Sequence, residues 1–218
     1  MAFVRSERVR PGRGLESIAS LIAPPLCAAC GSTRPVDLVL CEPCSAELAV
    51  APRVLDPGPP GVDLAISVSP FEGVARRVVH GLKYGRRLAL ARVAAEAMLH
   101  ALAGREAPGA VAPVPAGPWR WRWRGFDPAE EIAIAVSERA HLPYAPCLRR
   151  NRGPRQVGRR RWQRLTNPPR VRTVADPPGA VLLIDDVWTT GATLAACAGA
   201  LRADGCRRVV ALTLAHAL

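Results

Sequence analysis

The residues best suited to chemistry lie in one short stretch, Val181–Thr193, which reads VLLIDDVWTTGAT. An apolar run leads directly into two adjacent acids, and a Thr/Gly turn and the start of a helix follow. Backbone N–H groups at a helix start can converge on one phosphate, and a glycine allows the positive φ that this requires. Paired carboxylates at the carboxyl end of a buried strand suit the vicinal hydroxyls of a sugar. The stretch therefore predicts a binding site for a ribose 5-phosphate.

Within this hypothesis the acids are Asp185 and Asp186. The phosphate loop consists of Thr189, Thr190, Gly191, Ala192 and Thr193. The alternative is a core strand that ends in two solvated acids and a capped helix. Paired acids at the end of a buried strand are costly without a ligand or cation, which disfavours that alternative. Trp188 lies between the acids and the loop, where it either covers or stacks on a bound ligand or packs in the core.

Two Cys-x2-Cys pairs form a second group, and their four cysteines are Cys27, Cys30, Cys41 and Cys44. Four thiolates satisfy a tetrahedral zinc ion and leave no open position, which is typical of a structural site. Paired redox thiols and an iron–sulfur cluster are the alternatives. The other cysteines have no partner at a useful spacing and are expected to be small core or surface residues: Cys147, Cys197 and Cys206.

A third group alternates indole and guanidinium side chains along Trp119–Arg124. In an extended conformation, bases can stack on the aromatic face while phosphates pair with the cationic face, as in single-stranded nucleic-acid binding. Alternatively, the indoles pack under the domain while the arginines face a pyrophosphate or solvent. The candidate nucleic-acid residues are Trp119, Arg120, Trp121, Arg122 and Trp123.

The formal net charge of +12 and the pI of 10.8 favour a polyanionic partner. The charge is clustered, because residues 149–172 contain ten Arg and no acidic residue. The alternative is Arg enrichment of a solvated face by a GC-rich genome. No apolar run reaches the roughly 18–20 residues of a membrane helix, and we expect a cytoplasmic protein without membrane insertion.

These residues need a scaffold, and the pattern of the chain predicts an α/β protein with a mostly parallel sheet flanked by helices. We expect a basic arm and cysteine module over 1–50, a Pro/Gly linker over 51–61 and one α/β domain over 62–218. The expected strands are Leu64–Ser69, Ala110–Val114, Ala180–Ile184 and Val209–Leu214. The expected helices are Gly73–Lys83, Leu88–Ala103, one capped by Asp127 and limited by Pro143, and Leu194–Ala203, which Gly205 follows.

The phosphate stretch closely resembles the phosphoribosyl pyrophosphate (PRPP) signature of type I phosphoribosyltransferases. Asp185, Asp186 and the loop from Thr189 to Thr193 match that signature position by position. The resemblance implies the type I phosphoribosyltransferase fold. It also implies that the two acids hold the ribose 2- and 3-hydroxyls while the loop holds the 5-phosphate.

Further segments resemble the competence protein F (ComF) branch of this superfamily, which pairs a cysteine module with the transferase fold. The matching segments are His80–Tyr84, Val114-Pro115, Arg124–Phe126 and the spaced set Gln156, Arg164 and Asn167. Departures from the family pattern are Asp127 in place of Asn, Pro128 after it, Arg159 in place of an apolar residue, and Pro168-Pro169 in place of Ala-Phe.

The resemblance implies Mg²⁺-dependent displacement of pyrophosphate from PRPP by a nitrogen nucleophile, with Asp185, Asp186, Lys83 and Arg124 as the catalytic set. Arg150 and Arg155 are further candidates to clamp the leaving pyrophosphate. It also implies a link to DNA uptake and the competence machinery. The alternative function is therefore binding of single-stranded nucleic acid, with PRPP only as a regulatory ligand or with no role.

Overall fold

The computed structural model describes residues 24–35, 37–48, 53–54, 58–106, 108–117, 122–151 and 169–217. Its helices are α2 (Glu42–Leu48), α3 (Gly73–Gly85), α4 (Ala89–Leu102), α6 (Pro128–Ala140) and α8 (Ala192–Ala203). Its strands are β1 (Arg53–Val54), β2 (Leu64–Pro70), β3 (Ala110–Pro113), β4 (Leu148–Arg150), β5 (Val171–Thr173), β6 (Ala180–Trp188) and β7 (Arg208–His216).

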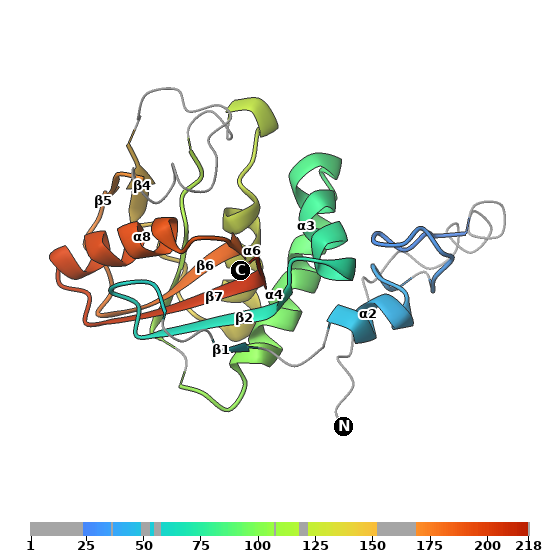
Figure 1. The fold of residues 1–218 in the computed structure, drawn as a ribbon, viewed down its shortest axis with the longest axis horizontal. Helices are drawn as coiled ribbons and strands as arrows, with labels where there is room; N and C mark the ends of the chain where they lie inside the picture. Colours follow the sequence, from blue (N-terminus) through green and yellow to red (C-terminus); the bar gives the residue numbers. More distant parts are fainter. Residues whose placement is uncertain are drawn as a thin grey trace.

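A five-stranded sheet in the order β1-β2-β7-β6-β3 forms the centre of the described chain (Figure 1). The pairs β2–β7, β7–β6 and β6–β3 are parallel, and the short β1 is antiparallel to β2. The carboxyl ends of these four parallel strands therefore share one edge of the sheet. Open α/β sheets bind their ligands at this edge, so a ligand is expected beside the residues that end β6.

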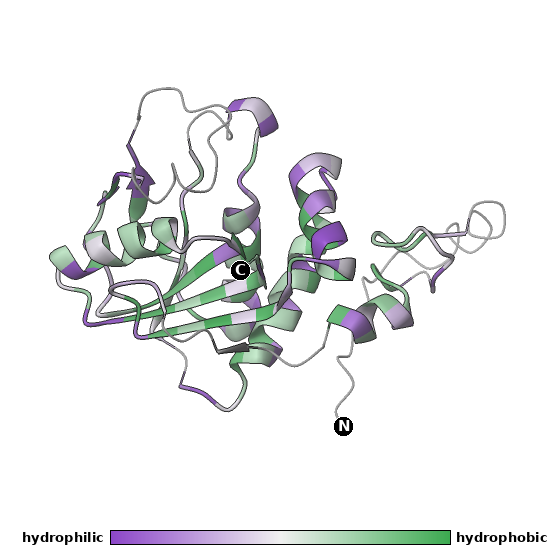
Figure 2. Cartoon of the chain, in the orientation of Figure 1, coloured by the Kyte–Doolittle hydropathy of each residue, from purple (hydrophilic) through white to green (hydrophobic). Residues whose placement is uncertain are grey.

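Helices cover both faces of the sheet, and alternate residues of β6 pack on each side. Leu182 and Ile184 belong to a core cluster with residues of α2, α3, α4 and α6. Val181 and Leu183 belong to a second cluster that contains α8 and part of β4. The strands are apolar along most of their length in Figure 2, as expected for parallel strands buried on both faces.

The cysteine module, which we define as described residues 24–48, lies beside α3 (Figure 1). Its side chains Cys27, Leu40, Cys41, Cys44 and Leu48 belong to the same core cluster as α3 and α4. The module therefore shares its apolar interior with one face of the sheet domain.

The expected α/β architecture is confirmed, with differences at several element ends. β6 continues to Trp188 instead of ending at Ile184, because Asp185 and Val187 still pair with β7. Two residues of the expected linker form β1, and the antiparallel pair β4–β5 was not expected. No helix in the described ranges combines the length and apolar character that crossing a membrane requires.

Candidate functional site

Two adjacent carboxylates at the end of β6 form the centre of the site. Asp186 continues the side of β6 that faces α3, and its Oδ2 lies 2.5 Å from Nζ of Lys83 on that helix. Asp185 precedes it in the strand and therefore points to the opposite side, the side of the α8 layer. Burial first, and then the charge of Asp185, raise the pKa of the Cys197 thiol in α8. The end of β6 therefore presents one carboxylate toward each helical layer.

The ion pair between Lys83 and Asp186 is largely shielded from solvent, with side-chain exposures of 18% and 11%. Removal of either partner would destabilise the protein, because the remaining charge would be unpaired and would lack most of its hydration. The pair connects the last turn of α3 directly to the carboxyl end of β6.

Asp185 carries an unusual proton affinity. Burial first, and then the charge of the adjacent Asp186, raise the pKa of Asp185 well above its usual value. The charge of Lys83 and the N–H of Asp186, which donates to Asp185 Oδ1 at 2.8 Å, act in the opposite direction. A group that supplies hydrogen-bond donors or positive charge here would stabilise the ionised carboxylate.

Gly191 joins the acids to α8 with φ at +72°, in the left-handed region that favours glycine. The N-cap residue of α8 is Gly191 itself, which has no side chain to cap the helix, and Ala192 N donates to Thr190 Oγ1 at 3.4 Å. The first N–H groups of a helix and its dipole favour an anion at this end. The loop thus provides donors directly beside the two carboxylates.

Trp188 packs in the core and does not face the site openly. Its side chain is 7% exposed and belongs to the cluster around α8. A Cβ added to Gly191 would lie 3.2 Å from Trp188 Nε1 and 3.3 Å from Cγ of Pro59. Of the two alternatives for this indole, the structure supports packing, with the ring forming the underside of the phosphate loop.

Asp127 brings a third carboxylate close to the first two. Its Oδ1 accepts from Ala129 N at 3.1 Å and caps α6, as expected, with Pro128 in the first turn. Its Oδ2 accepts from Ala116 N at 2.7 Å and thereby holds the segment after β3. Burial first, and the nearby charges of Asp186 and Glu130, raise the pKa of Asp127 to about 6, against the effect of both N–H donors.

Two arginines approach the same edge of the sheet. The guanidinium of Arg150, at the end of β4, lies 3.9 Å from where a Cβ on Gly117 would be, next to the segment that Asp127 holds. Arg124 places its guanidinium carbon 5.2 Å from the ring centroid of Tyr84. Among the described residues, no hydrogen-bond acceptor reaches the buried Nε of Arg124.

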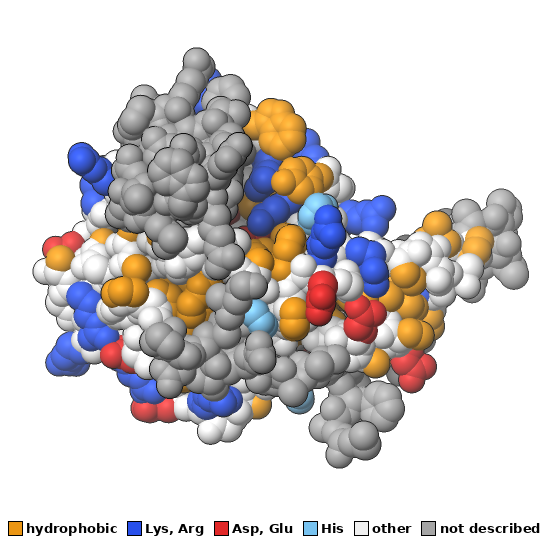
Figure 3. Space-filling view, viewed as in Figure 1, with side chains coloured by type: hydrophobic (Ala, Val, Ile, Leu, Met, Phe, Trp, Pro, Cys, Tyr) orange, Lys and Arg blue, Asp and Glu red, His pale blue; other side chains and the backbone are white. Residues whose placement is uncertain are grey.

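A row of aromatic rings runs along the outer side of α3, a feature that sequence analysis did not anticipate. Ring centroids lie 6.1 Å apart for Phe71–His80, 5.5 Å for His80–Tyr84 and 6.5 Å for Tyr84–Trp123. Tyr84 and Trp123 are 59% and 69% exposed. Figure 3 shows hydrophobic and basic side chains intermixed over this region. In the sequence, only the four-residue spacing from His80 to Tyr84 indicated that two of these rings lie side by side on a helix.

The cysteine module positions four thiols for one metal ion. The sulfurs of Cys27, Cys30, Cys41 and Cys44 lie within 4.8 Å of one another. Cys30 Sγ and Cys41 Sγ are 3.6 Å apart, and ligands of a tetrahedral zinc ion with bonds of about 2.3 Å are about 3.8 Å apart. Hydrogen bonds with Ser32 lower the pKa of Cys30 to about 6, while burial raises that of Cys44. Within the described ranges no other cluster of possible ligands has this geometry.

The remaining cysteines are part of the apolar core rather than a site, since Cys147, Cys197 and Cys206 are all buried. Several site candidates lie outside the described residues: Trp119, Arg120, Trp121, Arg155, Gln156, Arg164 and Asn167. Of the alternating Trp/Arg run, the structure describes Arg122, Trp123 and Arg124, and Arg122 is exposed.

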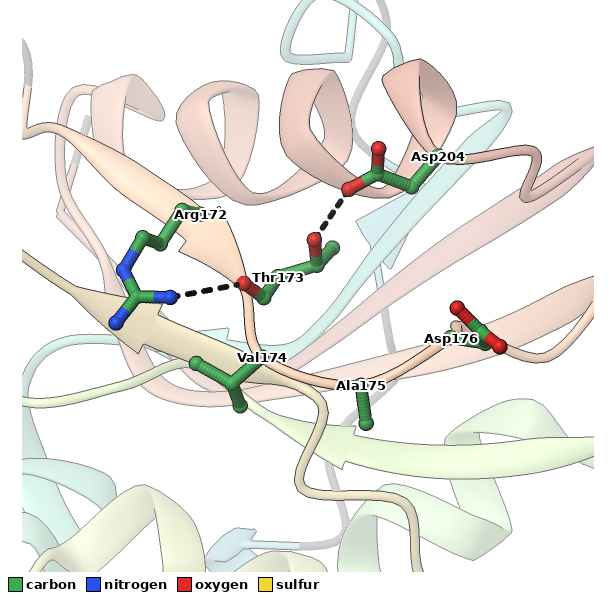
Figure 4. Close-up of a pocket in the computed structure, with 6 residues that line it drawn as sticks. All are labelled: Arg172, Thr173, Val174, Ala175, Asp176 and Asp204. Carbon is green, nitrogen blue, oxygen red and sulfur yellow. Dashed lines mark hydrogen bonds between the residues drawn. The ribbon is translucent and has the colours of Figure 1, made fainter.

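A shallow hollow of about 490 Å³ lies at the other end of α8 (Figure 4). Its lining includes Arg172, Asp176 and Asp204, and Thr173 Oγ1 donates to Asp204 within it. The hollow is separate from the carboxylates, because Asp204 follows the carboxyl end of the helix whose amino end forms the phosphate loop.

A scan of the chain against models of protein families finds no match, and a search of the curated proteins finds none either.

Proposed function

We propose that the chain is a type I phosphoribosyltransferase that binds PRPP at the carboxyl end of β6. The observation that carries this proposal is the direct succession of Asp185, Asp186 and the uncapped start of α8 at Gly191. One half of this arrangement accepts hydrogen bonds from a diol, and the other half donates to a phosphate. A sugar phosphate satisfies both halves together.

In the proposed reaction, the bond from ribose C1 to the pyrophosphate oxygen breaks, and pyrophosphate leaves with the electron pair. A nitrogen atom of the acceptor forms the new bond to C1 and releases its proton. The leaving group needs positive charge, which Arg124 and Arg150 are suited to provide near the segment after β3. Mg²⁺ would enter with the phosphates of the ligand and neutralise them. The cysteine module would hold a structural zinc ion.

Lys83 has a double role in this proposal. It balances the charge of Asp186, and its ammonium group would also attract the phosphates of bound PRPP. Burial and the charge of Asp186 raise the pKa of Asp185, and the charge of Lys83 offsets only part of this effect. Ribose hydroxyls that donate to Asp185 would favour its ionised form, so that ligand binding is expected to release a proton.

Calorimetric titration of the zinc-loaded protein with PRPP and Mg²⁺ tests this proposal. We expect a dissociation constant of roughly micromolar order and an affinity at least about tenfold lower in Asp185→Asn/Asp186→Asn. Asp176→Asn, an exposed acid at the hollow of Figure 4, is the control and should bind like wild type. A folded wild-type protein that takes up no PRPP would refute the proposal.

A second candidate function is binding of single-stranded nucleic acid, and the exposed row from His80 through Tyr84 to Trp123 favours it. Bases can stack on such rings, and Arg124 adds a cation beside Tyr84. The net charge of +12 supplies long-range attraction for phosphates.

Fluorescence anisotropy with a labelled oligothymidylate tests the second candidate. We expect Tyr84→Ala and Trp123→Ala each to weaken binding about tenfold, since stacking contributes roughly 1–3 kcal/mol per base. Val174→Ala, an exposed apolar residue near the hollow, should leave affinity unchanged. The wild-type affinity should fall steeply with salt, and salt-independent binding would contradict this function.

A further inference from the structure

Helix α3 lacks its own amino-terminal cap, and the cysteine module provides one. Glu72 at the N-cap position makes no side-chain capping bond. Instead, Oε1 of Glu47 in α2 accepts from Val74 N at 2.7 Å, and its Oε2 lies 3.7 Å from Arg77 Nη2. A negative carboxylate at this end satisfies an orphan donor and complements the helix dipole.

Gly73 makes this approach possible, because a Cβ at that position would lie 2.0 Å from Glu47 Oε1. Its φ of +47° also lies in the region that favours glycine. The start of α3 is thus shaped to receive a side chain from an element that lies earlier in the chain.

The other end of α3 contacts the metal-ligand loop. The helix ends at Gly85, and its C-cap residue Arg86 has a left-handed φ of 48°. Arg87 follows, and its Nη1 donates to the carbonyl oxygen of Ala28 at 2.6 Å. Ala28 lies inside the first Cys-x2-Cys turn, between Cys27 and Cys30. The turn that provides two of the four thiols therefore anchors the carboxyl end of α3 as well.

Between these two anchors, α3 carries Lys83 in its last turn. Lys83 reaches Asp186 at 2.5 Å, one turn before Arg87 contacts Ala28. The orientation of the helix therefore decides whether the ammonium group reaches the carboxylate of β6. Through α3, the cysteine module is connected to the proposed ligand site by direct contacts alone.

We infer that the cysteine module positions Lys83 through helix α3, so that metal binding at the four cysteines and ligand binding at the end of β6 are coupled. Glu47 and Arg87 are the positioning residues. Loss of metal would unfold a module this short, and α3 would lose both anchors. By thermodynamic reciprocity, a ligand held at Lys83 and Asp186 must then strengthen metal binding. The identity of the ligand rests on the function proposed above, but the contact pathway does not.

The first test measures the equilibrium affinity of the full chain for zinc by competition with a chelating dye, with and without PRPP and Mg²⁺. We expect saturating PRPP to raise this affinity by about fivefold or more. Glu47→Ala should still bind zinc but lose most of this gain, and Glu47→Gln, which keeps an acceptor oxygen, should retain part of it. Glu42→Ala, an exposed acid of the same helix α2, is the matched control and should behave like wild type. PRPP that binds measurably but leaves the zinc affinity of wild type unchanged would overturn the coupling and leave the proposed function intact.

The second test needs no ligand. Hydrogen exchange of the zinc-loaded and the chelated protein is compared by mass spectrometry. Removal of metal should accelerate exchange of the α3 amides about fivefold or more, including those around Lys83, while α8 should change little. Faster exchange in residues 24–48 alone, with α3 unchanged, would refute the inference whether or not PRPP binds.

Discussion

At the scale of single residues, Asp127 links two backbone segments close to the paired acids of β6. One carboxylate caps α6 and holds the segment after β3 through two backbone N–H groups. An amide in its place could accept from one of these groups but would turn its NH₂ toward the other. The two oxygens of a carboxylate can both accept, which matches the two N–H donors that Asp127 contacts.

The raised pKa of Asp127 predicts a pH dependence of stability. Its pKa is about 6 in the folded protein against an ordinary 3.8, so the folded state keeps a proton that the unfolded state loses. The stability contribution is full below about pH 4 and is lost as pH rises through about 6, by roughly 3 kcal/mol at most. Urea unfolding between about pH 4 and pH 7 should show this decline in wild type and a smaller one in Asp127→Asn. Parallel pH profiles for the two proteins would contradict this assignment.

At the scale of elements, the site depends on the junction of β6 with α8. Gly191 is in the left-handed region there, with the Trp188 ring and Pro59 close on one side. The junction cannot move toward either neighbour, and this fixes the direction of the first N–H groups of α8. The packing of Trp188 and Pro59 against Gly191 thus holds the start of α8 in place.

Gly191→Ala should therefore lower stability by about 1–2 kcal/mol, since an L-residue is strained at this φ. It should also weaken PRPP binding, because the added methyl group displaces the loop. Gly199→Ala in the same helix is the matched control, because nothing lies within 4 Å of its added Cβ. Removal of a helix-interior glycine there should raise stability by about 0.5–1 kcal/mol. Thermal unfolding and calorimetry measure both effects, and equal behaviour of the two variants would argue against a special role of Gly191.

The elements that sequence analysis located were those with strong local signals. The apolar run before Asp185 indicated a buried strand, and Asp127-Pro128 indicated a helix start. The continuation of β6 to Trp188 was not predicted, because Asp185 and Asp186 interrupt the apolar run by which the strand was recognised. The backbone pairing with β7 nevertheless continues through these residues. The contacts of Lys83 with Asp186 and of Glu47 with Val74 join distant parts of the chain, so no local pattern could reveal them.

At the scale of the whole molecule, the module and the sheet domain share one apolar core. Cys27 and Leu214 belong to the same buried cluster, although they lie near opposite ends of the described chain. Arg202 places its Nη2 2.6 Å from both carboxylate oxygens of Asp63 and thereby joins the end of α8 to the start of β2. A change in the module should therefore affect α3 and α4, which pack in the same cluster, more than α8, which packs in the other one.

The position of β7 in the sheet has a consequence for how the chain folds. β7 lies between β2 and β6 and pairs with both, yet it follows every other strand in the sequence. During synthesis, β2 and β6 therefore emerge with facing edges that have no partner, and such edges favour wrong pairings. The sheet can close only when residues 208–216 leave the ribosome, so the parallel pairs that build the site form late and over long sequence distances. A nascent chain of this protein thus keeps the β1–β2 pair apart from the β3–β6 pair until its last strand is available.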